Sequence, residues 1–191
     1  MKDLKISKTH IQPIIDWCYK KNNLKFHTPV NRGSRNDANK LVDGHEGPIW
    51  GFPKLNEMPL DLAPVPFPYS ELAEIEYEIL SKYRFDNYYR ECKFGTILSY
   101  SQEGHQVHEH QDPAMMGQDY VHTRFNVLIS KPEEGGMPIL DGKELKVEEL
   151  QVWMCFASEY LHSTTKVVGK KDRIMLSFGY DIHRSELTKW L

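Results

Sequence analysis

Two stretches in the second half of the chain indicate its fold: TRFNVLIS at residues 123–130 and RIMLSFGY at residues 173–180. Both are short, rich in apolar, β-branched and aromatic residues, and flanked by polar or turn-forming segments, which is typical of β-strands. Runs of the same kind lie at residues 94–100, 137–140 and 152–156. Short strands at this spacing, without helices between them, predict an antiparallel sandwich or barrel such as a jelly roll.

The first half of the chain has a different character. It holds two amphipathic helix candidates, one at residues 9–22 and one that runs from Ser70, the expected N-cap, to Tyr83. Between them, residues 24–69 carry seven prolines and four glycines and show no periodicity. Two interpretations stay open for this stretch: a lid or binding loop, or loops that contain a short strand around residues 48–52.

Length and composition limit the classes of protein to consider. The chain has 191 residues, of which 40% are hydrophobic and 27% charged, as in an ordinary soluble domain. Its net charge of −3 lacks the basic excess typical of nucleic-acid binding. No apolar run approaches the about 20 residues of a membrane span, and the N-terminus does not resemble a secretory signal. Nucleic acid and membranes are therefore disfavoured as partners.

From this pattern we expect a single domain over residues 1–191. It would consist of a helical and loop part at residues 1–91, an all-β core at 92–182 and a short helix at 185–191. The three cysteines are an odd number at wide spacing, which indicates reduced core residues rather than disulfides or a zinc site. We accordingly expect a cytoplasmic protein.

A dense group of histidines indicates a metal site. Four of the nine histidines lie within the 18 residues 105–122, and Asp112 stands among them. Read as a strand, residues 104–112 place His108, His110 and Asp112 on one face and His105 on the other. Another histidine, His162, ends a later strand pattern. Two imidazoles and one carboxylate form the facial triad of non-haem Fe(II) oxygenases, whereas a structural zinc site needs a fourth ligand.

An arginine on the next predicted strand is suited to bind a small anionic molecule beside the metal. Arg173 follows His162 by 11 residues, and Ser177 shares its face of the strand. A planar guanidinium binds a carboxylate through two parallel hydrogen bonds. Arg173 is therefore a candidate anchor for the distal carboxylate of 2-oxoglutarate.

These residues, in this order, resemble the Fe(II)/2-oxoglutarate-dependent oxygenases over about residues 94–181. In the prolyl-hydroxylase-like branch, a strand tyrosine lies ten residues, and a glycine six residues, before the first iron histidine; Tyr100, Gly104 and His110 keep this register. The Glu-Gly-Gly turn at residues 134–136 also resembles the family. The spacing from His162 to Arg173 is slightly longer than is usual in the family. The predicted strands at Arg124 and Arg173 are also similar to strands of the aspartyl/asparaginyl hydroxylases.

The resemblance implies a double-stranded β-helix, a jelly roll of the cupin-like kind, supported by N-terminal helices. It implies a 2-oxoglutarate/Fe(II)-dependent dioxygenase that hydroxylates a C–H bond of a prolyl or other amino-acid residue in a peptide or protein, or of a free amino acid. Fe(II), 2-oxoglutarate and dioxygen would take part, with ascorbate considered as reductant. The expected metal ligands are His110, Asp112 and His162, with no further catalytic residue, and the expected cosubstrate contacts are Arg173, Ser177 and Tyr100.

Several alternatives remain open around this site. His108 is an alternative metal ligand to His110, although the glycine register then slips by two residues. Arg124, Asn126 and His108 are tentative substrate contacts, and Arg124 would be an ordinary solvated charge if it lay on the outer face of its strand. The other two histidines of the group, His105 and His122, are expected to contact substrate, orient Asp112 or lie at the surface.

Two other functions compete with the oxygenase interpretation. One is a non-catalytic, metal-binding cupin-like domain. The other is a nucleobase demethylase, which requires aromatic stacking residues and a basic channel around the cavity. At the end of the last predicted strand, Asp181 and His183 are expected to be surface groups.

Overall fold

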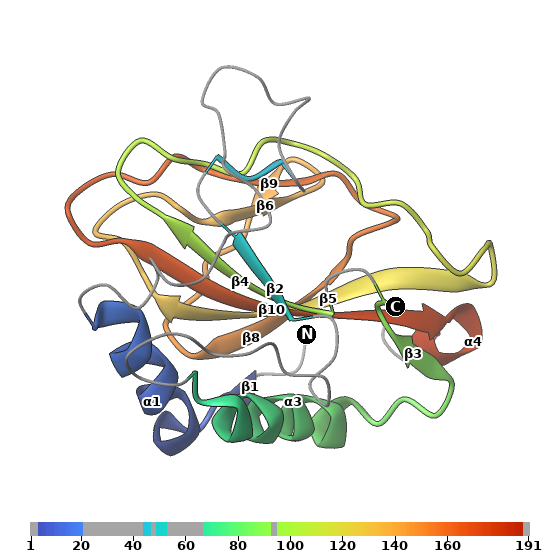
Figure 1. The fold of residues 1–191 in the computed structure, drawn as a ribbon. Helices are drawn as coiled ribbons and strands as arrows, with labels where there is room; N and C mark the ends of the chain where they lie inside the picture. The colour runs from blue at the N-terminus through green and yellow to red at the C-terminus, as the bar shows by residue number, and fades with distance from the viewer. Residues whose placement is uncertain (1–3, 21–43, 47–48, 53–66, 93–94, 189–191) are drawn as a thin grey trace.

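The computed structural model describes residues 4–20, 44–46, 49–52, 67–92 and 95–188. Seven of its strands form one antiparallel sheet at the centre of the molecule (Figure 1). From edge to edge, these strands are β1 (Leu4–Lys5), β8 (Gln151–Phe156), β5 (Tyr120–Ser130), β10 (Arg173–His183), β4 (Thr96–Ser101) and β2 (Ile49–Phe52), with β3 (Tyr88–Arg90) beside the end of β10. The predicted antiparallel, mainly β fold is confirmed.

The five strand runs predicted from the sequence are all present, with boundaries that differ by up to three residues. The short strand considered at residues 48–52 is also present, as β2, which pairs with β4. The lid interpretation concerns residues 24–69, of which 24–43, 47–48 and 53–66 lie outside the described residues.

A second, smaller sheet lies over one face of the main sheet (Figure 1). Its three antiparallel strands are β7 (Lys143–Glu144), β6 (Pro138–Leu140) and β9 (His162–Thr164). Two antiparallel sheets that face each other are the arrangement expected of a jelly roll.

The strand predicted at residues 104–112 is not continuous. The segment makes only isolated bridges, between Val107 and His45 and between His110 and His162. One reason is that the amide of Val107 donates to the side-chain Oγ1 of Thr164 at 2.9 Å instead of to a backbone carbonyl. The regular ladder of a strand is thereby interrupted.

Two helices, α1 (Lys8–Tyr19) and α3 (Tyr69–Tyr83), cover the opposite face of the main sheet (Figure 1). The hydroxyl of Ser7 caps α1 by accepting from the amide of Thr9. The predicted cap of the second helix is wrong: α3 begins one residue earlier, after Pro68, and Ser70 donates to Glu71 within its first turn. Between helices and sheet lies the main apolar core, whose fully buried residues include Ile11, Ile14, Leu72, Ile75, Ile79, Phe125 and Phe178.

The structure also decides two smaller expectations, which concern the C-terminal helix and the cysteines. A short helix, α4 (Arg184–Leu187), follows the last strand as expected, and residues 189–191 lie outside the described residues. All three cysteines are free, but only Cys18 and Cys155 are buried; Cys92 is exposed, so its assignment to the core is wrong. Among the described helices, none is long and apolar enough to span a bilayer.

Candidate metal centre and binding cavity

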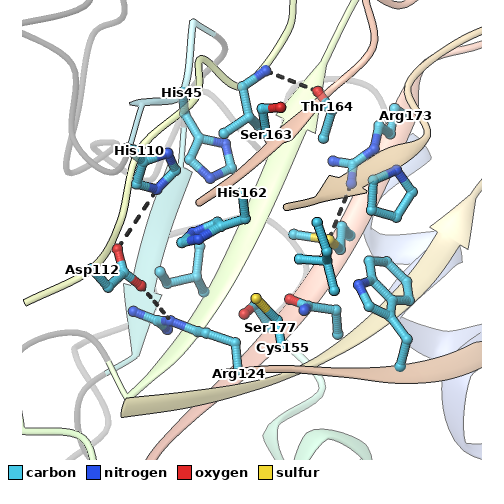
Figure 2. Close-up of a pocket in the computed structure, with 17 residues that line it drawn as sticks. His45, His110, Asp112, Arg124, Cys155, His162, Ser163, Thr164, Arg173 and Ser177 are labelled. Atoms are coloured by element: carbon cyan, nitrogen blue, oxygen red, sulfur yellow. Dashed lines mark hydrogen bonds and ion pairs between the residues drawn. The ribbon is translucent and has the colours of Figure 1, made fainter. Parts of the chain in front are cut away.

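A cavity lies between the two sheets, and both sheets supply its walls. Figure 2 shows the residues that line it. Alternation along β5 places Arg124 and Asn126 on this side of the main sheet, while Phe125 and Val127 pack in the core under the helices. The same strand therefore contributes to both the core and the cavity.

His110, Asp112 and His162 meet on one side of this cavity. One potential ligand atom of each lies within 4.8 Å of those of the other two. The backbones of His110 and His162 exchange two hydrogen bonds, of 3.0 and 2.8 Å, and the amide of Asp112 donates to the carbonyl of Ala157 at 2.9 Å. Backbone pairing thus fixes the distance between ligands that are far apart in the sequence.

Both histidines are held in the orientation that a metal requires. Nδ1 of His110 lies 2.7 Å from the carbonyl oxygen of His108, and Nδ1 of His162 lies 3.1 Å from that of Tyr160. Because a carbonyl only accepts, each Nδ1 carries the hydrogen, which leaves the lone pair of each Nε2 for a metal.

The charge states also suit a divalent cation. Burial by itself raises the pKa of Asp112, but His122 and Arg124 lower it well below its ordinary value. Burial and the neighbouring His110 lower the pKa of His162. At pH 7 Asp112 is therefore ionised and His162 neutral, which are the forms that bind metal.

Arg173 lies on the other side of the cavity from His110 and Asp112 (Figure 2). It is 1% exposed, and its Nε donates to the carbonyl of Gly136 at 2.7 Å. Nη1 of Arg173 is buried and has no hydrogen-bond partner among the described residues. Burial lowers the pKa of Arg173 to about 10, so the guanidinium remains charged at pH 7. A buried cation with a spare donor suits an anionic ligand.

Steric constraints explain the two glycines of the Glu-Gly-Gly turn. Gly135 and Gly136 both have positive φ, of 66° and 64°. A Cβ at Gly136 would lie 2.9 Å from Cδ of Arg173, and one at Gly135 would lie 1.9 Å from the carbonyl oxygen of Lys166. Gly136 thus allows the turn to pack directly on the arginine, and Gly135 allows it to approach the backbone of Lys166.

Three more of the expected site residues line the cavity. Ser177 and Asn126 are cross-strand neighbours on β10 and β5. Arg124 also faces the cavity, so the alternative of a solvated outer-face charge is wrong. Its Nε lies 3.7 Å from Oδ2 of Asp112.

Two expected site residues are not brought to the cavity lining. Tyr100 pairs with Ile174 in the β4–β10 register, one residue out of phase with Arg173, and its hydroxyl donates to Asp172. His108 has its Nε2 at 3.0 Å from Oε1 of Glu46. Neither residue lines the cavity, and His108 does not belong to the three-ligand cluster.

His45 is a cavity residue that the sequence did not indicate. It is 7% exposed and points into the cavity beside His110 and His162 (Figure 2). Gly44, with φ of 68°, permits this approach, because a Cβ there would lie 2.8 Å from Nδ1 of His110. Burial, with Arg173 and His110 nearby, lowers the pKa of His45 to about 3, so its ring is neutral at pH 7. The spacing of residues in the sequence could not have indicated His45, because a β-bridge to Val107, which is distant in the chain, brings it to the site.

The donor set fits a non-haem iron site. Two imidazoles and one carboxylate are the ligands of the facial triad, which leaves coordination positions for other groups. The unpartnered Nη1 of Arg173 fits the free carboxylate of a dicarboxylic 2-oxo acid that reaches across the cavity.

No protein-family model matches the sequence, and no curated protein matches it. Solved structures do match in fold. The viral collagen prolyl hydroxylase of Paramecium Bursaria Chlorella virus-1, in complex with 2OG, has 15% identity and a TM-score of 0.57, with 95% of each chain covered. A Pseudomonas putida prolyl-4-hydroxylase has 12% identity and a TM-score of 0.59, with 96% of this chain and 92% of that chain covered.

A third match is the prolyl hydroxylase of Trichoplax adhaerens in complex with a peptide fragment of the hypoxia inducible factor oxygen degradation domain. It has 12% identity and a TM-score of 0.61, with 100% of this chain and 86% of that chain covered. The expected likeness to the Fe(II)/2-oxoglutarate oxygenases is therefore confirmed at the level of the fold.

Proposed function

We propose that this chain is a non-haem Fe(II)- and 2-oxoglutarate-dependent dioxygenase that hydroxylates a C–H bond. One observation carries the proposal: a cavity between two sheets has a His-Asp-His cluster on one side and a buried arginine with a spare donor on the other. A structural metal site has no need of such an arginine. The arrangement matches the two ends of 2-oxoglutarate, which chelates a metal at one end and carries a free carboxylate at the other.

Each part of the cavity then has a defined task. His110, Asp112 and His162 would hold Fe(II), and Arg173 with Ser177 would bind the distal carboxylate of 2-oxoglutarate. When bound, the metal supplies the redox chemistry that couples decarboxylation of 2-oxoglutarate to hydroxylation of the substrate. The buried side chains of Ile97, Val107 and Trp153 keep water away from the space between these anchors.

For the substrate, we propose a prolyl or other amino-acid residue in a peptide, or a free amino acid. The support is the shared fold with three proteins described as prolyl hydroxylases, one of which holds a peptide. The net charge of −3 also argues against an oligonucleotide substrate.

The test measures succinate formed from 2-oxoglutarate by the purified chain with Fe(II) and ascorbate. The reaction is run alone and then with pools of peptides, free amino acids and oligonucleotides. We expect slow turnover without substrate and stimulation by the peptide or amino-acid pool. Stimulation by the oligonucleotide pool alone would favour nucleobase demethylation instead.

Two variants make this test specific. His110→Ala removes a proposed ligand, whereas His10→Ala removes a histidine of α1, on the helix-covered side of the main sheet. We expect His10→Ala to retain turnover and His110→Ala to lose it. A wild-type chain that binds Fe(II) and 2-oxoglutarate but forms no succinate with any pool would favour the non-catalytic binding domain, and absence of either binding would refute the proposal.

A further inference from the structure

The carboxylate of Asp112 presents its two oxygens to different partners. Oδ1 lies 3.6 Å from Nε2 of His110, within the three-ligand cluster. Oδ2 lies 3.5 Å from Nε2 of His122 and 3.7 Å from Nε of Arg124. Figure 2 shows His110 and Arg124 on opposite sides of Asp112. One oxygen therefore faces the ligand cluster while the other is engaged from behind.

Both partners of Oδ2 are themselves held by buried acceptors. Nδ1 of His122 lies 3.3 Å from Oδ1 of Asp181, and Nη2 of Arg124 lies 3.7 Å from Oε2 of Glu91. The backbone amide of His122 donates to Oγ of Ser158 at 2.9 Å. None of these five residues is more than 8% exposed. Asp181, expected at the surface, is thus a buried member of this network, whereas His183 is half-exposed and caps α4.

The register of the main sheet builds the network. His122 on β5 pairs with Asp181 on β10, and Arg124 pairs with Gly179. A Cβ at Gly179 would lie 3.0 Å from Nη1 of Arg124, so the glycine makes room for the guanidinium. Two rigid strands therefore position the groups that engage Asp112.

We propose that His122 and Arg124 are positioning residues that hold Oδ2 of Asp112, so that Asp112 binds the metal through Oδ1 alone. This inference rests on the proposed metal site. A carboxylate binds metals with one oxygen or with both. In a facial triad, a second carboxylate oxygen would occupy a position that the cosubstrate or dioxygen needs. His122 and Arg124 keep that position open.

A positioning role and a purely electrostatic role predict effects of opposite sign. Arg124 is a cation near the proposed metal, so the loss of its charge alone would strengthen the binding of a divalent ion. The loss of a group that orients a ligand weakens metal binding, typically by about 10- to 100-fold. The direction of the change in an uncharged variant therefore separates the two roles.

A second buried network, on the helix-covered face of the same sheet, provides a matched control. Oε1 of Glu76, on α3, accepts from Nε of Arg90 at 3.0 Å and from the hydroxyl of Tyr180. Tyr180 directly precedes Asp181 on β10 but packs in the core under the helices. Glu76→Gln therefore disturbs a buried polar network that includes a residue of the same strand, Tyr180, but that has no contact with Asp112.

The test measures the Kd of Co(II) and Mn(II) for the full chain by calorimetry. It also records the visible absorption of bound Co(II), which reports coordination number and geometry. We expect Arg124→Met and His122→Leu to raise the Kd by about 10- to 100-fold and to change the spectrum. Arg124→Lys keeps the charge and His122→Gln keeps an N–H donor, so both should stay closer to wild type. Glu76→Gln should change neither the Kd nor the spectrum.

Each possible result either supports or refutes the positioning role of His122 and Arg124. Unchanged or tighter metal binding by Arg124→Met and His122→Leu overturns the positioning role, as does an equal loss in Glu76→Gln. Asp181→Asn loosens His122 without removing it, which keeps the test informative if a stronger variant does not fold: weaker binding supports the role and an unchanged Kd refutes it. A wild-type chain that binds no metal refutes the proposed function itself and not merely this inference.

Discussion

Along β10, alternate side chains serve two different environments. Leu176 and Phe178 point into the apolar core beneath α1 and α3, and both are fully buried. Arg173 and Ser177 point the other way, into the cavity. The helix-covered face is closed by apolar packing, whereas the cavity face carries charge. One strand therefore contributes stability through one set of residues and chemistry through the other.

The charged groups in the interior differ between the two faces in the same way. On the helix-covered face, Glu76 accepts from Arg90 and from Tyr180, and the network is internally paired. On the cavity face, Arg124 and Arg173 each keep a buried Nη1 without a hydrogen-bond partner among the described residues. A buried guanidinium with an unsatisfied donor is costly, so these two arginines mark the face that suits an anionic ligand.

The largest contrast between the faces is expected from His110→Ala. This change should abolish metal binding and reduce succinate formation to that of the protein-free blank, because one of three ligands is lost. The thermal midpoint of the metal-free protein should stay close to that of wild type, since among the described residues the ring makes one hydrogen bond, to the carbonyl of His108, and a longer contact, to Asp112. Metal content and turnover are measured together; full retention of both would show that the ligand assignment is wrong.

On the helix-covered face, Leu72→Ala should lower stability and leave metal binding unchanged. Leu72 lies on α3 with no exposed surface, so its truncation should lower the free energy of unfolding by about 2–5 kcal/mol. Urea denaturation of the metal-free chain measures this loss. The Kd of Mn(II) in the absence of urea should not change, and a parallel loss of metal affinity would mean that the two faces are not independent.

Arg173→Met tests the cavity face without touching the metal ligands. Removal of one partner of a buried charge-assisted pair costs about 2 kcal/mol or more, which is about 30-fold in Kd. We expect that increase for 2-oxoglutarate in the Mn(II)-loaded protein, with the Mn(II) affinity unchanged. The metal-free variant should be no less stable than wild type, because an incompletely paired buried cation is removed. Unaltered binding of 2-oxoglutarate would exclude Arg173 as its anchor.

The smallest effect is expected from an ion pair that belongs to neither face. Glu149 accepts from Nζ of Lys171 at 2.5 Å with 44% of its side chain exposed, so Glu149→Gln should cost less than about 1 kcal/mol at pH 7. Burial opposes ionisation, but Lys171 and the amide of Lys131 lower the pKa of Glu149 below its ordinary value of 4.5. This stabilisation is present above pH 4.5 and is lost as the pH falls through the lowered pKa. The thermal midpoint of the variant should therefore lie slightly below that of wild type at pH 7 and equal it at pH 3. A difference that persists at pH 3 would point to another contact.

Most of the fold could be predicted because strand patterns are local. The five apolar runs all became strands, and pairing with neighbours only extended or trimmed their ends, whereas residues 104–112 make only isolated bridges. The start of α3 was misplaced because Ser70 is a good cap in isolation, whereas the helix begins at Tyr69. Phe67 and Tyr69 pack against each other with ring centroids 5.0 Å apart, so core packing sets the entry to this helix.

The site could be predicted only in part. The positions of His110, Asp112, His162 and Arg173 in the chain were sufficient to suggest a cluster and an anchor, and the structure places them around one cavity. The face that Tyr100 occupies was not predictable, because a difference of one residue in register moves a side chain to the other face of a sheet.

The sequence by itself determined the alternation of apolar and polar residues along the strands, the order of the candidate ligands, and the Glu-Gly-Gly turn at residues 134–136. These are properties of neighbouring residues. Only the tertiary structure decided that His45 enters the cavity, that Asp181 is buried behind His122, and that Arg124 engages Asp112. Each of these contacts joins segments that are distant in the chain, and sheet register and loop path, rather than local pattern, set which of them meet.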